Sequence, residues 1–441
     1  MSDQDSNDTT ALGLSRRTFL AAASGVGGLA FAGAAPVRAA IVNTDFRGLP
    51  PYGNGTLPSG VRAHLVPNVN GLTVNFLEAG FETPGRPLVL MLHGFPNLAY
   101  SWRKVMPALA AAGYYVVAPD CRGFGRTAGW DDSWDADPLP FLALNLVRDQ
   151  IALVSALGYH STAMMVGHDQ GSLIAALGAL IRPDMFPRLT LIGGGFNGPP
   201  SFPFNSANGA PVPHADFTNA ELDAEYAKLD PPRKGYREYW ASPEADRDMK
   251  RVPQGMTNFF RAFYYMKSAD FPGNQNLRPL HAVHTAKEAA LQNAQMPEYY
   301  VMRRDRGMPE TVVVAMPDAV YIKACKWLTE PECEVYGLEY ARSGWTGGLH
   351  EYRHRRNDSY PPTLAEQLTF SGRTIDVPTQ VIAGKEDWGA NRTVGGPMNI
   401  GKTGYTQFKG VHMVAGAGHW AHEEQPEQVS QLLTGFLREH S

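Results

Sequence analysis

The sequence alternates between short apolar runs and segments with helical spacing, and this alternation limits the possible fold more than any other feature. A continuous apolar run is typical of a strand covered on both faces, as in a parallel sheet. Such runs lie at residues 87–92, 114–118, 162–166 and 189–194. Helical spacing lies between them, at residues 100–112, 142–157 and 172–181. The alternation predicts a parallel sheet with helices on its faces.

The alternation stops near Gly195 and returns much later, which predicts an inserted region. A Pro-, Gly- and Asn-rich stretch typical of a linker comes first, and a helical, aromatic-rich region follows it. Strand patterns return at residues 377–383 and 411–414, before a final helix at 426–439 that begins with proline. Near the start of the core, residues 72–79 alternate loosely, and we expect them to form an edge strand.

These boundaries predict an α/β core that is interrupted by a cap. The core takes residues 40–200 and 366–441, and the linker and helical cap take residues 201–365. Residues 1–39 precede both parts and have a different composition, with an Ala- and Gly-rich apolar run.

The first 39 residues resemble a twin-arginine export signal. Arg16 and Arg17 precede the apolar run, and a small residue, Ala39, precedes the expected cut. The run is too short and too rich in glycine for a stable membrane span. We therefore expect the twin-arginine machinery as a partner and a periplasmic or secreted location. The alternative is a disordered tail with a chance arginine pair.

Charge and cysteine content exclude some classes of protein. Lys and Arg number 39 against 43 Asp and Glu, for a net charge of -4. A nucleic-acid groove or a polybasic membrane surface would need concentrated positive charge, so neither is expected. The three cysteines are Cys121, Cys325 and Cys333. Cys325 and Cys333 could close a short loop, although buried free thiols are the favoured interpretation.

A carboxylate stands where a strand is expected to turn sharply into a helix. The strand at residues 162–166 runs into Gly167-His168-Asp169-Gln170-Gly171. A central residue flanked by glycines in this position is typical of a nucleophile elbow. An aspartate there is suited to attack on saturated carbon, with formation of an ester. The alternative is a simple turn with a helix-capping aspartate.

Two further polar residues follow later strands in the order nucleophile, acid, histidine. Asp387 lies in Gly384-Lys385-Glu386-Asp387-Trp388, and His419 lies in Gly416-Ala417-Gly418-His419-Trp420. The sequence His93-Gly94-Phe95-Pro96 follows the first core strand, where an oxyanion loop is expected. Together these elements predict a catalytic group of three residues, with Asp169 as the nucleophile, His419 as the base and Asp387 as the acid that orients His419.

At this point the chain resembles the epoxide hydrolase branch of the α/β-hydrolases. The resemblance covers nearly all of the chain after the signal, and it implies a mostly parallel eight-stranded sheet with an inserted helical cap. The motifs that carry it are HGFPNLAYSWR (93–103), DCRGFGR (120–126), GHDQGS (167–172), GKEDW (384–388), GHWAHEEQPEQV (418–429) and, in the cap, SGWTGGLHEYR (343–353).

The resemblance implies roles for individual residues. Two cap tyrosines, Tyr352 and Tyr265, with Tyr264 as a competitor for the second place, would donate hydrogen bonds to the epoxide oxygen. The backbone N–H groups of Phe95 and Gln170 would form the oxyanion hole. The product would be a vicinal diol, and no metal or other cofactor is expected.

The expected substrate is a small apolar or aromatic epoxide. Aromatic residues and Met are frequent in the cap, and they suggest an apolar binding surface. We expect His93, Pro96 and Trp345 to contact the substrate. The sequence does not indicate an oligomeric state.

Three alternative functions are compatible with parts of the sequence. A dehalogenase would use the same aspartate, but Gln170 stands where haloalkane dehalogenases usually place tryptophan and fluoroacetate dehalogenases place arginine. A zinc protease is suggested by His350-Glu351-Tyr352-Arg353-His354, which has the form H-E-x-x-H but no obvious third ligand. The third alternative is an α/β-hydrolase that binds ligands without catalysis.

Overall fold

The computed structural model describes residues 49–194, 196–199, 217–356, 366, 368–392, 394–401 and 403–440. The predicted signal at residues 1–39 and most of the predicted linker therefore lie outside the described residues. Within the described ranges, no helix is both long enough and apolar enough to cross a bilayer.

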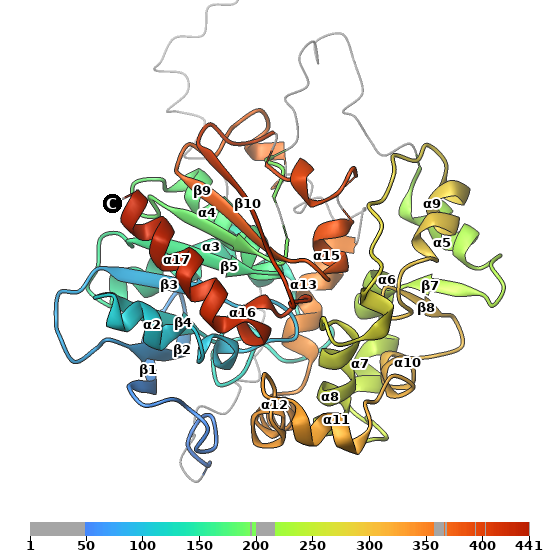
Figure 1. The fold of residues 1–441 in the computed structure, drawn as a ribbon, viewed down its shortest axis with the longest axis horizontal. Coiled ribbons are helices and arrows are strands. Elements are labelled where there is room, and N and C mark those ends of the chain that lie inside the picture. Colours follow the sequence, from blue (N-terminus) through green and yellow to red (C-terminus); the bar gives the residue numbers. More distant parts are fainter. Residues whose placement is uncertain are drawn as a thin grey trace, which may run out of the picture. The chain divides into compact units, whose positions relative to one another are not determined.

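A mostly parallel sheet of eight strands forms the centre of the described chain (Figure 1). Its spatial order is β1-β2-β4-β3-β5-β6-β9-β10. The pairs β1–β2 and β2–β4 are antiparallel, and every other neighbouring pair is parallel. The strands are β1 (Val61–Val69), β2 (Leu72–Ala79), β3 (Leu88–Leu92), β4 (Tyr115–Pro119), β5 (Met164–His168), β6 (Leu189–Ile192), β9 (Thr379–Gly384) and β10 (Phe408–Val414).

The prediction that residues 72–79 form an edge strand is wrong. They form β2, which lies between β1 and β4, and β1 takes the edge. The sequence of β1 contains Pro67 and several exposed side chains, including Leu65, and its register shifts between Val66 and Val69. An edge strand tolerates proline and buries few apolar side chains, so β1 gives no apolar pattern to detect.

Helices of the core pack against the sheet and against one another. Figure 1 shows α17 passing in front of the strands, where it contacts α2, while α3 packs on α4. The core helices are η2 (Ala99–Trp102), α2 (Met106–Ala111), η3 (Leu139–Phe141), α3 (Ala143–Ala156), α4 (Gln170–Ile181), α15 (Trp388–Asn391), η6 (Pro397–Asn399), α16 (Ala421–Glu424) and α17 (Pro426–Glu439). The helix predicted at 100–112 is divided into η2 and α2, because Pro107 is compatible only with the first turn of a helix.

The predicted cap is inserted between two strands that pair with each other. β6 and β9 are parallel neighbours, and the elements between them are mainly helices. These elements are α5 (Asn219–Tyr226), β7 (Arg233–Gly235), α6 (Tyr236–Trp240), α7 (Pro243–Met249), α8 (Met256–Met266), η5 (Pro272–Asn274), α9 (Ala286–Asn293), β8 (Val301–Arg303), α10 (Met308–Val313), α11 (Ala319–Ala324), α12 (Glu330–Ser343) and α13 (Thr346–Arg356). The small β7–β8 pair was not predicted, because strands of three residues are too short to show a period.

Buried polar contacts join the cap to the core. Arg103 forms ion pairs of 2.8 Å with Glu332 on α12 and with Glu423 on α16. The hydroxyl of Tyr264 on α8 donates to Asn97 Oδ1 at 3.0 Å. Removing one partner of a buried pair leaves the other charge or dipole unsatisfied, so these contacts fix the position of the cap over the strand ends.

The three cysteines are buried free thiols. Cys325 and Cys333 do not pair with each other, which is the favoured of the two interpretations from the sequence.

Candidate active site

Asp169 occupies a strained turn at the carboxyl end of β5. Its φ is 51°, a value that side chains other than glycine rarely adopt. The neighbouring glycines are required by space. A Cβ on Gly167 would lie 2.3 Å from the carbonyl oxygen of Gly171, and one on Gly171 would lie 2.5 Å from that of His93. The crowded turn therefore accepts only glycine at these places, and it directs the Asp169 carboxylate out of the sheet.

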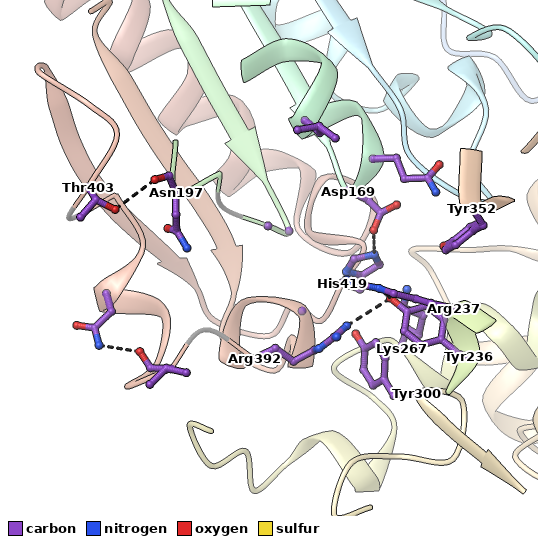
Figure 2. A pocket seen from close by; sticks show the side chains of 17 residues that line it. Asp169, Asn197, Tyr236, Arg237, Lys267, Tyr300, Tyr352, Arg392, Thr403 and His419 are labelled. Carbon is purple, nitrogen blue, oxygen red and sulfur yellow. Dashed lines mark hydrogen bonds and ion pairs between the residues drawn. The ribbon is translucent and has the colours of Figure 1, made fainter. Parts of the chain in front are cut away.

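The structure brings Asp169, His419 and Asp387 together. His419 Nε2 lies 3.4 Å from Asp169 Oδ2, and His419 Nδ1 lies 3.3 Å from both Asp387 oxygens. Asp387 follows β9 and His419 follows β10, two parallel neighbours whose carboxyl ends meet at the same edge. Figure 2 shows the Asp169 carboxylate and the His419 ring facing each other. The imidazole thus lies between two carboxylates and is almost fully buried.

The charges of this group oppose the effect of burial. Burial alone would raise the pKa of Asp169, but the hydrogen bond and charge of His419 and the nearby ammonium of Lys267 hold that pKa well below its usual range. Burial and Lys267 lower the pKa of His419, but the carboxylates of Asp387 and Asp169 outweigh them and raise it. Asp169 is therefore ionised at neutral pH, which is the form that a nucleophile needs.

One predicted oxyanion donor already contacts the carboxylate. The backbone N–H of Phe95 donates to Asp169 Oδ1 at 3.1 Å. Gln170 follows Asp169 at the start of α4 and lines the same cavity.

His93 holds the loop that carries Phe95, and it does not contact the cavity. Its Nδ1 donates to the carbonyl of Gly94 at 2.9 Å, and its Nε2 accepts from the N–H of Cys121 at 3.0 Å. Burial lowers the pKa of His93 to about 4, so the ring is neutral at pH 7 and both nitrogens are occupied. The predicted substrate contact of His93 is replaced by a positioning role.

Glu424 fixes the loop that carries His419. Its carboxylate accepts hydrogen bonds from the N–H groups of Gly418, Trp420 and Ala269, at distances between 2.7 and 3.1 Å. Gly418 and Trp420 flank His419, and Ala269 belongs to the cap. No feature of the letters singles out this glutamate, apart from its place in the motif at residues 418–429.

A cavity of about 900 Å³ opens onto Asp169. Its size is within the usual range for small-molecule sites. Four of the predicted site residues line it: Asp169, Gln170, Tyr352 and His419. The lining residues are Asp169, Gln170, Leu173, Gly193, Gly194, Asn197, Tyr236, Arg237, Lys267, Tyr300, Tyr352, Gly389, Arg392, Val394, Asn399, Thr403 and His419.

Pro96, on the loop after β3, and Trp345, in the cap, are buried and do not line this cavity, as is also true of His93. Trp345 is 3% exposed and stacks on Phe260 and Trp240, with ring centroids 5.5 and 5.8 Å away. The three predicted substrate contacts are therefore packing or loop-holding residues. A residue next to a motif has its backbone close to the site, but its side chain can point away from the substrate.

Tyr265 does not reach the cavity. Its ring packs on Tyr321 and Phe271, at centroid distances of 4.8 and 5.6 Å. Its competitor Tyr264 is fully buried against Trp420. Successive side chains of a helix point about 100° apart, so Tyr264 and Tyr265 lie on different faces of α8. Neither of them lines the cavity.

Tyr236, which the sequence analysis missed, lies beside Tyr352 in the cavity wall. Their ring centroids are 6.4 Å apart, edge to face. Tyr236 precedes Ser242 and Pro243, and Pro243 begins α7. Tyr265 stands shortly before Pro272-Gly273, as the family resemblance implies for the second tyrosine, whereas glutamate follows Pro243 after Tyr236. A search for a tyrosine shortly before any helix-initiating proline would have found Tyr236.

The Tyr236 hydroxyl is held between two guanidinium groups. It accepts from Arg237 Nε at 3.1 Å and from Arg392 Nη1 at 3.3 Å. Burial would raise the pKa of Tyr236, but the positive charges of Arg237, Arg392 and Lys267 lower it to about 7. This tyrosine is therefore a much stronger acid than an ordinary phenol.

The H-E-x-x-H segment lies on α13, and the first of its two histidines, His350, packs against aromatic rings. His350 packs on Phe141 and Trp134, and its Nδ1 lies 2.8 Å from Arg353 Nη1. A guanidinium in contact with a ring nitrogen disfavours a metal cation there. Among the described residues, no group of three or more His, Cys, Asp or Glu is arranged to hold a metal ion.

Comparison with known proteins identifies the fold. Residues 87–229 match the family model of the alpha/beta hydrolase fold. This chain is an α/β-hydrolase by fold. The expected mostly parallel sheet with helices is thereby confirmed.

The similar proteins are epoxide hydrolases by name. Epoxide hydrolase B of Mycobacterium tuberculosis is 28% identical over 389 residues, which are 85% of this chain and 98% of the relative. Epoxide hydrolase A of the same organism is 27% identical, over 84% of this chain and 95% of the relative. Among solved structures, an epoxide hydrolase from an endophytic Streptomyces has a TM-score of 0.64 at 27% identity, over 86% of this chain and 96% of that one. Potato epoxide hydrolase I has a TM-score of 0.63 at 25% identity, over 86% and 99%.

Proposed function

We propose that this α/β-hydrolase opens an epoxide to a vicinal diol through an ester on Asp169. The observation that carries the proposal is that a nucleophilic carboxylate and two hydroxyl donors line one cavity. An ionised carboxylate stands on the nucleophile elbow, and two tyrosines, Tyr236 and Tyr352, line the same cavity. The names of the relatives and of the similar structures support the same reaction.

In the first step, Asp169 attacks a carbon of the epoxide ring. Asp169 Oδ1 accepts from the N–H of Phe95, so Oδ2 is the oxygen that forms the new bond. The carbon–oxygen bond of the ring breaks, and its electron pair goes to the epoxide oxygen. Tyr236 and Tyr352 donate hydrogen bonds to that oxygen, and a proton passes to it from Tyr236. The two guanidiniums that contact Tyr236 stabilise the resulting phenolate.

In the second step, water hydrolyses the ester. His419 Nε2 takes a proton from the water, and the water oxygen attacks the carboxyl carbon of Asp169. Asp387 orients the imidazole through Nδ1 and stabilises its positive charge. The developing oxyanion is Asp169 Oδ1, which already lies 3.1 Å from the Phe95 N–H. The bond from that carbon to Oδ2 then breaks, and Oδ2 leaves with the substrate and takes the remaining proton of the water, which completes the diol. The proton on His419 returns to the Tyr236 phenolate.

A panel of epoxides and haloalkanes, assayed with the wild type and with Asp169→Asn, tests this function. We expect diol formation from epoxides that is lost in Asp169→Asn, with little release of halide. Halide release without diol formation would favour a dehalogenase, which shares the nucleophile but lacks the two tyrosine donors. Diol formation that Asp169→Asn leaves unchanged would remove the proposed nucleophile.

We also propose that residues 1–39 direct export of the folded protein by the twin-arginine route. The paired Arg16 and Arg17, the apolar run and the small residue Ala39 support this proposal. Replacing both arginines with lysine in the full chain should keep the protein in the cytoplasm of a bacterial host, as measured by fractionation. Export that continues unchanged would contradict it.

A further inference from the structure

Three basic side chains line the cavity that opens onto Asp169. They are Arg237 on α6, Lys267 at the C-terminal end of α8 and Arg392 just after α15, and we call them the cavity cations. Figure 2 shows them gathered around Tyr236 and Tyr300, next to His419. Three separate segments thus contribute positive charge to one wall.

The cavity cations differ in their exposure: Lys267 is buried, Arg392 is half-buried and Arg237 is exposed. In the described part of the chain, none of the three forms an ion pair with a carboxylate. A buried charge is ordinarily paired, because an isolated charge loses its hydration without compensation. Three buried arginines of the core follow that rule, since Arg103 pairs with Glu423, Arg122 with Asp149 and Arg126 with Glu339. Arg261 on α8 is an exception among the described residues, because it donates to the carbonyl of Leu328 and pairs with no carboxylate.

Lys267 shows this lack of a partner most clearly. Its side chain is 7% exposed, and its ammonium nitrogen lies 4.9 Å from the ring centroid of Trp420 and 5.5 Å from that of Phe263. Aromatic faces attract a cation, but they do not replace hydrogen-bond acceptors. An ammonium has three N–H donors, and among the described residues no oxygen accepts from this one. The group is therefore suited to an oxyanion that enters the cavity.

The two guanidiniums have further donors beyond those used on Tyr236. Arg237 donates through Nε and Arg392 through Nη1, and within the described ranges neither makes another hydrogen bond. Each guanidinium has five N–H donors in a planar fork that matches a carboxylate. Tyr236 alone thus accounts for only part of this positive charge.

The charges of the proposed reaction leave Lys267 without a counter-ion. Asp387 is occupied by His419 and by the N–H of Gly389. Asp169 loses its negative charge when it becomes an ester. In the proposed first step that charge passes to Tyr236, which lies against Arg237 and Arg392. A negative group on the substrate would compensate Lys267 at every stage of the reaction.

Building on the proposed function, we infer that the cavity selects epoxides that carry a carboxylate. The Lys267 ammonium is the main anchor, and the remaining donors of Arg237 and Arg392 supply a second set of contacts. The tyrosine rings of the wall, Tyr236, Tyr300 and Tyr352, contact the apolar part of the substrate. This inference changes the expectation from the sequence, which was an apolar or aromatic epoxide without a charge.

A matched pair of substrates tests the inference: trans-3-phenylglycidate and its neutral amide, which has nearly the same shape. We expect kcat/KM to favour the acid by about tenfold or more, mainly through KM, since one charged contact commonly contributes at least that factor. Lys267→Met should bring the ratio of acid to amide close to one. Lys267→Arg should keep the preference. The control is Lys228→Met, a lysine on the exposed surface, which should leave the ratio unchanged.

Binding of 3-phenylpropanoate and 3-phenylpropanamide, measured by titration calorimetry, separates this inference from the proposed function. If epoxides are not hydrolysed but the acid binds more tightly than the amide and Lys267→Met removes the difference, the cation site stands and the proposed function fails. If both epoxides are hydrolysed with equal kcat/KM, or if Lys267→Met leaves the ratio unchanged, the function stands and the inference is overturned. Activity of Lys267→Met on the amide shows that the variant folds.

Discussion

The two walls of the cavity are built in different ways. The core wall presents Asp169, His419 and the Phe95 N–H, each on a loop that directly follows a strand of the sheet. The cap wall presents tyrosines and two of the cavity cations, Arg237 and Lys267, from helices and from residues after them, whereas Arg392 follows the core helix α15. The core wall holds the carboxylates, and the positive charge is concentrated around Tyr236.

The two walls obtain their geometry from different sources. Neighbouring parallel strands end at one edge of the sheet, so the register alone brings their following residues together. The cap has no such common frame, and its side chains depend on helix phase and packing. We therefore expect changes on the core wall to stop the reaction and changes on the cap wall to tune its rate, its pH dependence and its substrate.

The largest effect is expected on the core wall, from His419→Gln. The ester on Asp169 should form but persist, because the base that activates water is missing; turnover should fall by about 10³-fold. Mass spectrometry should show the mass of the epoxide added to the peptide that contains Asp169. His422→Gln, a change at a buried histidine outside the proposed mechanism, is the control, and no adduct should accumulate there. An unmodified peptide in His419→Gln with turnover lost would indicate a role for His419 before ester formation.

A smaller effect is expected from the cap tyrosines. Tyr236→Phe and Tyr352→Phe should each lower the rate of epoxide opening by about 10²-fold, because one donor to the leaving oxygen is lost. Tyr265→Phe is the matched control, and its rate should stay within about twofold of the wild type, since surface changes away from a site have little effect. Pre-steady-state measurement of ester formation provides the rates. A loss in Tyr265→Phe as large as in Tyr236→Phe would restore the assignment made from the sequence.

The activity should depend on pH through one group on each wall, Tyr236 on the cap wall and His419 on the core wall. Only the protonated phenol of Tyr236 can donate a proton, so activity should decline as pH rises through its pKa of about 7. The guanidiniums favour the phenolate, so Arg392→Met should raise that pKa and move the alkaline limb upward by about one pH unit. The acid limb belongs to the core wall, because His419 must be neutral to accept a proton and its pKa is raised. The pH profile of kcat/KM measures both limbs, and an unmoved alkaline limb in Arg392→Met would assign that limb to another group.

The smallest effect on turnover is expected from Glu424→Gln. This change weakens the hydrogen bonds that hold the loop of His419, and the free energy of unfolding should fall by about 2 kcal/mol. Exposed Glu427 is close by on α17, and Glu427→Gln should change the stability by less than about 0.5 kcal/mol. Denaturant titration gives both values. Equal stability of the two variants would show that Glu424 does not hold the loop.

The sequence predicted the core wall because backbone geometry determines it. Each of its features can be recognised from a short stretch of sequence: the strand ends, the glycines around Asp169, and the order of Asp387 and His419. β1 has no such pattern, because a half-exposed edge strand does not require apolar residues at regular positions. The division of the helix at Pro107 follows from a local rule, because proline is compatible only with the first turn of a helix.

The cap wall was predicted only in part. Tyr352 lies in a motif of recognisable form, and the structure places it in the cavity. Tyr236 and the cavity cations come from segments whose relative positions depend on tertiary packing, so no local pattern reveals that they meet. His93, Pro96 and Trp345 show the opposite error, in which proximity to a motif was taken as contact with the substrate.

The proposed reaction requires a covalent bond between Asp169 and the substrate. A single turnover in ¹⁸O-labelled water, with enzyme in excess over epoxide, tests that bond most directly. Because water attacks the carboxyl carbon, the label should appear in the Asp169 carboxylate, and the diol should take its new oxygen from the protein and remain unlabelled. A labelled diol released from an enzyme whose Asp169 peptide stays unlabelled would show that water opens the epoxide directly, which contradicts the account.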